Sequence, residues 1–114
     1  MKILVSGKIS KRELENMASD LFGDMVKGVV DVGKESIALD AELHSDLEAA
    51  LLEKGSSQKD LWGINIYPGL SGEDMVEFDA LINIRPSQNN CSRGVEDPGI
   101  QEKINEIVHK RVDL

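Results

Sequence analysis

An alternating run in the first half of the chain constrains the fold most, because hydrophobic residues recur there at every second position. Period two is typical of strands with one buried face. The inward positions are Val26, Gly28, Val30 and Val32 on one strand and Ile37, Leu39, Ala41 and Leu43 on the next. Gly33-Lys34 fits a two-residue hairpin turn with glycine at its first central position. This register sets Val30 opposite Ile37 on the buried side and Lys27 opposite Asp40 on the exposed side, as favourable cross-strand pairing requires.

Helix start signals lie on both sides of this hairpin and again near the end of the chain. Ser10 to Glu13 has the spacing of a capping box, and the helix that follows is predicted to stop at Gly23. A second capping box, Ser45 to Glu48, predicts a helix that runs to Gly55. Asp97-Pro98 places an N-cap residue before a proline at the first helical position, so a last helix is expected to begin there.

A second hairpin is predicted between the second and third helices. Its two alternating strands are joined by the turn-rich segment from Pro68 to Gly72. The inward residues are Trp62, Ile64 and Ile66, then Val76, Phe78, Ala80, Ile82 and Ile84. With Ile3 to Val5 as a short edge strand, the order α-β-β-α-β-β-α predicts an α+β fold. We expect one domain over residues 1–114, built as a mostly antiparallel sheet of two hairpins with the helices packed on one face.

Net charge and cysteine content limit the classes of binding partner and the cellular compartment that we expect. The 114 residues carry a net charge of -8, which disfavours nucleic-acid binding and anionic membrane surfaces, because both depend on Lys and Arg. No stretch is long and apolar enough to span a bilayer. Cys91 is the only cysteine, so an internal disulfide is impossible and a reducing cytoplasm is the expected location.

The loop from Arg85 to Asp97 is the first candidate site. It is rich in hydrogen-bonding side chains and ends at a fresh helix N-terminus, where free N–H groups and guanidinium forks favour an anion. The predicted ligand-binding residues are Arg85, Ser87, Gln88, Asn89, Ser92 and Arg93. The alternative is structural: these side chains satisfy the loop's own backbone, and the arginines pair with Glu96 or Asp97.

A carboxylate–imidazole set around His44 is the second candidate. On a strand, Glu42 and His44 would point the same way, and Asp46 follows just beyond. Such a set is suited to a divalent metal or to proton transfer, with Asp79 as another available carboxylate. The alternative is that His44 is an exposed strand-end residue beside a helix start, and a single histidine is a weak metal signal. No metal site is therefore predicted.

The exposed face of the second hairpin is the third candidate. Its polar side chains are Asn65, Tyr67, Glu77, Asp79, Asn83 and Arg85. This face is either open to water or a contact surface, including one for a second copy of the chain in a homodimer. No phosphate-loop, dinucleotide, zinc or serine-nucleophile motif is present, so the sequence names no cofactor.

Several segments resemble a family of small uncharacterised prokaryotic proteins, a domain of unknown function. They are Phe22–Lys27, Glu42–His44, Leu61–Pro68, Ile82–Gln88 and Ser92–Asp97. The resemblance covers nearly the whole chain and implies a stand-alone bacterial or archaeal cytosolic protein. It implies no activity and no catalytic residues.

Two functions remain open from the sequence. The favoured one is a domain that binds a small anionic ligand, or a protein partner, through the Arg85–Asp97 loop. The other is a small metal-assisted or acid–base enzyme that uses Glu42, His44 and a nearby aspartate.

Overall fold

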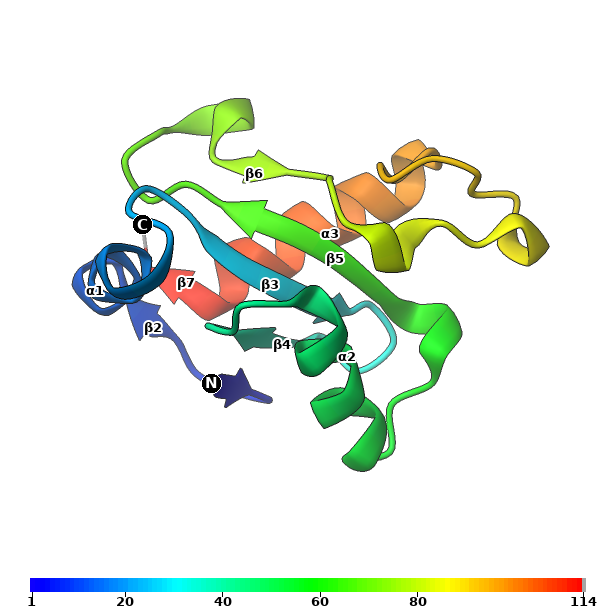
Figure 1. Ribbon diagram of the computed structural model, residues 1–114, viewed down its shortest axis with the longest axis horizontal. Helices are drawn as coiled ribbons and strands as arrows, with labels where there is room; N and C mark the ends of the chain where they lie inside the picture. Colours follow the sequence, from blue (N-terminus) through cyan, green and yellow to red (C-terminus); the bar gives the residue numbers. More distant parts are fainter. Residues whose placement is uncertain (114) are drawn as a thin grey trace.

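The protein is built around a five-stranded sheet whose neighbouring strands are all antiparallel, in the order β1-β4-β3-β5-β6. The structure, a computed structural model, describes residues 1–113. A small parallel sheet pairs β2 with β7 (Figure 1). The strands are β1 (Lys2–Leu4), β2 (Ile9–Ser10), β3 (Val26–Asp31), β4 (Ser36–Leu39), β5 (Leu61–Ile66), β6 (Val76–Glu77) and β7 (Val112–Asp113). The helices are α1 (Lys11–Leu21), α2 (His44–Glu53) and α3 (Pro98–Arg111). The predicted α+β class and short N-terminal edge strand are confirmed.

The caps of α1 and α3 follow the sequence signals. The Ser10 hydroxyl accepts a hydrogen bond from the Glu13 backbone N–H at 3.1 Å. Gly23 has a positive φ of 94° and donates its N–H to the Ala18 carbonyl, which ends α1. Asp97 accepts from the Gly99 N–H at 2.8 Å, with proline at the first position of α3. Both predicted helix starts are confirmed.

The first hairpin has the predicted register but a different turn. Val30 lies opposite Ile37, and Asp31 opposite Ser36, so the loop has four residues rather than two. The positive φ falls on Glu35, at 55°, and not on Gly33. Asp31 Oδ1 accepts from the Gly33 and Lys34 N–H groups at 2.9 Å each, and this side-chain turn replaces the predicted glycine turn.

The start of α2 differs from the prediction. β4 ends at Leu39, and Asp40 adopts a left-handed φ of 74° that ends the extended strand. The helix begins at His44 with Leu43 as N-cap, and no side chain caps it. The Ser45–Glu48 capping box is therefore wrong, and so is the placement of Glu42 and His44 on one strand face.

The second hairpin is much shorter than predicted. β6 pairs with β5 over only Val76 and Glu77, and the chain then leaves the sheet for a 3-10 turn at Leu81–Asn83. Ile82 packs with the cluster on the α2 side of the sheet, and Ile84 is exposed, so the predicted inner face beyond Ala80 is wrong. The alternation of apolar residues continues beyond Glu77, but the backbone no longer pairs as a strand there.

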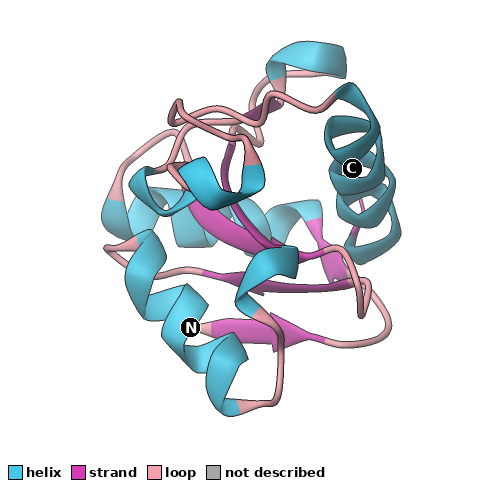
Figure 2. Ribbon diagram, turned by 90° about the vertical axis from the view of Figure 1, so that its right-hand side faces the viewer, coloured by secondary structure: helices cyan, strands magenta, loops and turns pink. Residues whose placement is uncertain are grey.

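Hydrophobic clusters cover both faces of the sheet. The larger cluster packs α1 and α3 against one face, through residues such as Leu14 and Ile104. The smaller one packs α2 against the other, where Val29 and Ala38 are fully buried. Figure 2 shows the sheet between α3 and α2. The helices therefore do not share one face as predicted, because the central strands are apolar on both sides.

Among residues 1–113, no helix combines the length and the apolar character needed to cross a membrane.

Candidate functional site

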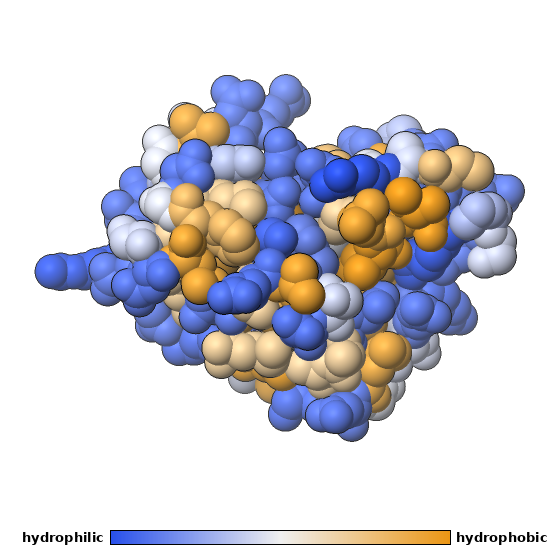
Figure 3. All heavy atoms as spheres, viewed as in Figure 1, coloured by the Kyte–Doolittle hydropathy of each residue, from blue (hydrophilic) through white to orange (hydrophobic). Residues whose placement is uncertain are grey.

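A cleft of about 540 Å³ opens on the α2 side of the sheet. It lies where the first turn of α2, the neighbouring ends of β3 and β5, and the chain after β6 meet. Its lining residues are Met25, Lys27, Leu43, His44, Ser45, Asn65, Tyr67, Glu77, Asp79, Leu81, Ile82 and Arg93. Figure 3 shows hydrophobic side chains on both sides of a polar, hollowed strip on this face. The volume lies within the range of small-molecule sites.

His44 lines the cleft as a buried residue, with 8% of its surface exposed. Its Nε2 is 2.9 Å from the Ile64 carbonyl oxygen. Because a carbonyl only accepts, Nε2 carries the hydrogen and Nδ1 of the neutral ring is an acceptor. Burial lowers the pKa of His44 below its ordinary value of 6.5, opposed in part by the Ile64 carbonyl. His44 is therefore neutral at pH 7.

Acid should weaken the fold through His44. The folded pKa lies below the unfolded value of 6.5, so the stability that neutral His44 contributes is present above pH 6.5 and is lost as the pH falls through the folded pKa. We expect His44→Gln to show a smaller loss of unfolding free energy than the wild type between about pH 7.5 and about pH 5.5. Urea unfolding at both pH values measures this loss.

His109→Gln is the matched control, because His109 is the other histidine, is exposed on α3 and hydrogen-bonds with the Asn105 carbonyl of its own helix. A reduced loss in His109→Gln as well would show that the effect is not specific to His44. An equal pH dependence of His44→Gln and wild type would contradict the assignment of His44 as a buried neutral group.

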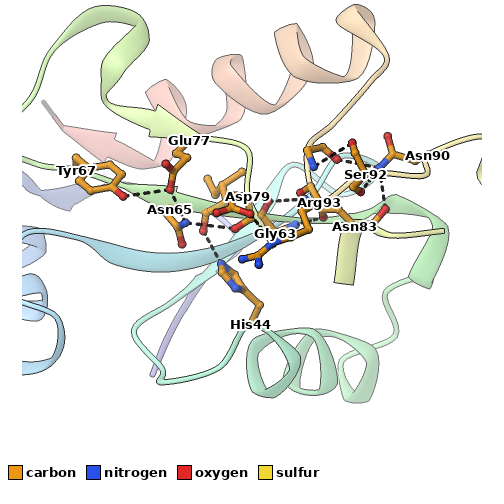
Figure 4. Close-up of polar contacts among 12 residues, drawn as sticks. His44, Gly63, Asn65, Tyr67, Glu77, Asp79, Asn83, Asn90, Ser92 and Arg93 are labelled. Carbon is orange, nitrogen blue, oxygen red and sulfur yellow. Dashed lines mark hydrogen bonds and ion pairs between the residues drawn. The ribbon is translucent and has the colours of Figure 1, made fainter. Parts of the chain in front are cut away.

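A hydrogen-bonded chain joins three polar residues on the floor of the cleft (Figure 4). Asn65 Nδ2 donates to Glu77 Oε1 at 2.8 Å and to the Asp79 carbonyl at 3.3 Å. The Tyr67 hydroxyl donates to the same Glu77 oxygen at 3.1 Å. Burial, and then the Glu77 carboxylate, raise the pKa of Tyr67, which keeps its hydroxyl protonated as a donor.

Asn65 has an unused acceptor at this site. The residue is 5% exposed, and its Oδ1 has no hydrogen-bond partner within residues 1–113. A buried polar atom without a partner is unusual in a native protein, because its desolvation is not compensated. A donor supplied by a ligand would satisfy it.

Arg93 lies beside Asp79, on the side away from Tyr67 (Figure 4). Its Nε is 2.7 Å from Asp79 Oδ1, and 56% of its side-chain surface is exposed. Its backbone carbonyl accepts from the Ala80 N–H at 3.0 Å and from Asn83 Nδ2 at 2.9 Å. An exposed ion pair adds little stability, so Asp79 chiefly orients the guanidinium, and the pair engages only its Nε.

Arg85 and Gln88 lie away from this cleft. The Arg85 guanidinium stacks on the Trp62 ring with its central carbon 4.2 Å from the ring centroid, and donates to the Gln58 and Leu61 carbonyls. Burial lowers the pKa of Arg85. Gln88 donates to the Lys59 carbonyl at 3.0 Å. These donors hold the loop against the segment before β5.

The remaining predicted loop residues are exposed at the surface. Ser87 and Asn89 belong to a tight turn, in which Asn89 has a left-handed φ of 59°. The Ser92 hydroxyl accepts from the Gly94 N–H at 3.2 Å. Of the six residues predicted to bind a ligand, only Arg93 lines the cleft.

Two residues outside that predicted set organise the loop. Asn90 is buried; its Nδ2 donates to the carbonyls of Asn83, Ser92 and Gly94, and its Oδ1 accepts from the Glu96 N–H. The Glu96 carboxylate accepts from the Cys91 and Ser92 N–H groups, which lowers its pKa. The loop therefore follows the structural alternative for its backbone, with Asp79 rather than Glu96 as the partner of Arg93.

The carboxylates predicted around His44 do not converge on it. Glu42 contributes its backbone carbonyl, which accepts from Lys27 Nζ at 2.9 Å, and neither Glu42 nor Asp46 lines the cleft. Asp79 is the predicted carboxylate that shares the cleft with His44. In residues 1–113 no group of three or more His, Cys, Asp or Glu side chains could hold a metal ion.

One protein-family model matches nearly the whole chain. The chain matches the family described as protein of unknown function (DUF5674) over residues 3–111, and it belongs to that family. Comparison with curated proteins and with solved structures found no match.

Proposed function

We propose that this protein binds a small ligand carrying an anionic group in the cleft between α2 and the chain after β6. The observation that carries the proposal is the convergence of Arg93, His44 and Asn65 on one cavity, with buried Asn65 Oδ1 lacking a partner within residues 1–113. These residues come from three distant segments of the chain. A concave site with a few convergent polar groups is typical of small-molecule sites.

Arg93 is the anion-binding residue in this proposal. Its Nε is engaged by Asp79, and the fork of terminal nitrogens can still bind a carboxylate or phosphate in two-point fashion. Lys27 adds a second positive charge to the lining, although its ammonium already donates to the Glu42 carbonyl. The neutral ring of His44 contributes hydrogen bonding without a charge.

Thermal unfolding with inorganic phosphate, acetate and isobutyrate tests the proposal. We expect at least one of these anions to raise the Tm of the wild type, since a ligand that binds only the native state stabilises it. Arg93→Ala should remove that shift, because losing a charge-assisted contact weakens binding about tenfold or more. Its Tm without ligand should stay close to that of the wild type, because the Arg93–Asp79 pair is exposed.

Arg12→Ala is the control, because it removes the same charge from an exposed position on α1 outside the cleft. Equal anion shifts in both variants would contradict the proposal, as would the absence of any shift in the wild type. A large loss of Tm in Arg93→Ala without ligand would instead assign Arg93 a structural role.

An acid–base enzyme is the alternative, and one observation favours it: a buried neutral His44 faces the same cleft as Asp79. The same samples distinguish the two functions when NMR spectra of the added ligand are recorded before and after incubation. A ligand chemically changed by the wild type and unchanged by His44→Gln would favour the enzyme.

A further inference from the structure

Two exposed leucines border the polar strip of the cleft. Leu43, the N-cap residue of α2, is 55% exposed, and Leu81, in the 3-10 turn, is 68% exposed. Met25 and Ile82 also line the cleft. Hydrophobic side chains gathered around a polar hollow are visible on this face in Figure 3. Apolar groups at a cleft indicate that part of its ligand is apolar.

Glu77 and Arg93 of the polar strip both have free hydrogen-bonding capacity. Asn65 and Tyr67 both donate to Glu77 Oε1, and neither of these bonds engages Glu77 Oε2. Figure 4 shows Asp79 between the Glu77–Asn65 pair and Arg93. A carboxylate oxygen accepts from an ammonium group, and a guanidinium fork donates to a carboxylate.

We propose that the cleft binds a small zwitterion with an apolar side chain. The ligand's ammonium lies at Glu77 Oε2, and its carboxylate lies at the Arg93 fork. Its side chain packs between Leu43 and Leu81. Free apolar amino acids and short apolar peptides share this chemistry. The inference rests on the proposed function, since it names the class of ligand for the same cleft.

Calorimetric titration with a matched ligand series tests the class. Leucine and the dipeptide Leu-Leu carry both charges, N-acetyl-leucine lacks the ammonium, and leucinamide lacks the carboxylate. We expect leucine or Leu-Leu to bind about tenfold or more tightly than either blocked compound, because each blocked end loses a charge-assisted contact. Whichever of leucine and Leu-Leu binds more tightly shows whether the ligand is a free amino acid or a short peptide.

Variants assign each end of the ligand to its residue. Glu77→Gln keeps an acceptor for Asn65 and Tyr67, and it should weaken leucine about tenfold while leaving N-acetyl-leucine unchanged. Leu81→Gln should weaken leucine more than glycine. The controls are Glu73→Gln and Leu70→Gln, two exposed residues outside this cleft, and both should bind like the wild type.

Some outcomes overturn this inference without touching the proposed function. If N-acetyl-leucine binds as tightly as leucine and Glu77→Gln has no effect, the cleft recognises an anion only. If neither leucine nor Leu-Leu binds, the zwitterion class is wrong, and the phosphate, acetate and isobutyrate titrations with Arg93→Ala decide the proposed function alone.

Discussion

Replacing Asn83 with leucine is expected to lower the free energy of unfolding by about 3 kcal/mol or more. Asn83 is fully buried beside β5, and its Oδ1 accepts from the Gly63 N–H at 2.8 Å. Its Nδ2 donates to the carbonyls of Gly63 at 3.0 Å and of Arg93 at 2.9 Å. Leucine has a similar size but cannot make these bonds, so buried backbone groups lose their partners. Urea unfolding followed by circular dichroism measures the change.

Asn16→Leu is the control for this substitution. Asn16 is exposed on α1, and no side-chain hydrogen bond of Asn16 exists among the described residues. It should leave the unfolding free energy unchanged or raise it slightly, because leucine favours a helix more than asparagine does. A loss of less than about 1 kcal/mol in Asn83→Leu would show that water replaces the amide at Gly63.

The first hairpin was predictable because several local signals agree. Alternating apolar residues place Val30 opposite Ile37, and the structure has that pair. A register shifted by one residue would expose the whole buried face, so the pattern determines the pairing even though the turn type was wrong. The Ser10 and Asp97 caps were predictable for a similar reason, since each depends only on residues within one helical turn.

The prediction of the second hairpin was wrong because the Asn83 side chain makes the hydrogen bonds to β5 that a neighbouring strand would make. Ala80, Ile82 and Ile84 alternate like a strand, but the Asn83 amide pairs with both backbone groups of Gly63 and no backbone pairing continues there. Alternation cannot reveal such a substitution. Glycine in the middle of a strand was a usable signal, because it often marks close approach by another segment.

The candidate site was predicted in pieces rather than as a whole. The exposed-face pattern placed Asn65, Tyr67, Glu77 and Asp79 together, and the pairing of Asn65 with Glu77 supports that placement. It also placed Arg85 there, but Arg85 stacks on Trp62, which belongs to the core on the other face. His44 was expected on a strand. In the structure the chain turns at the left-handed Asp40, and His44 is the first residue of α2, from which its side chain reaches the cleft.

Gly63 connects the fold to the cleft, and Gly63→Ala is expected to destabilise the protein by about 2 kcal/mol. A Cβ at this position would lie 2.4 Å from the Ala80 Cβ, 3.2 Å from Ile82 Cγ1 and 3.3 Å from His44 Cδ2. Carbon atoms in contact are normally about 3.5–4.0 Å apart, so the segment after β6 has to move. Differential scanning calorimetry measures the lower Tm.

Gly69→Ala separates crowding from any general effect of removing a glycine. A Cβ at Gly69 would have no atom of the described residues within 4 Å, and the φ of Gly69 is not left-handed. The Tm of Gly69→Ala should therefore match or slightly exceed that of the wild type. Because the Ala80–Asn83 segment holds the Arg93 carbonyl, Gly63→Ala should also weaken anion binding at the cleft. A variant with lower Tm but unchanged anion affinity would show that the cleft does not depend on how closely this segment approaches β5.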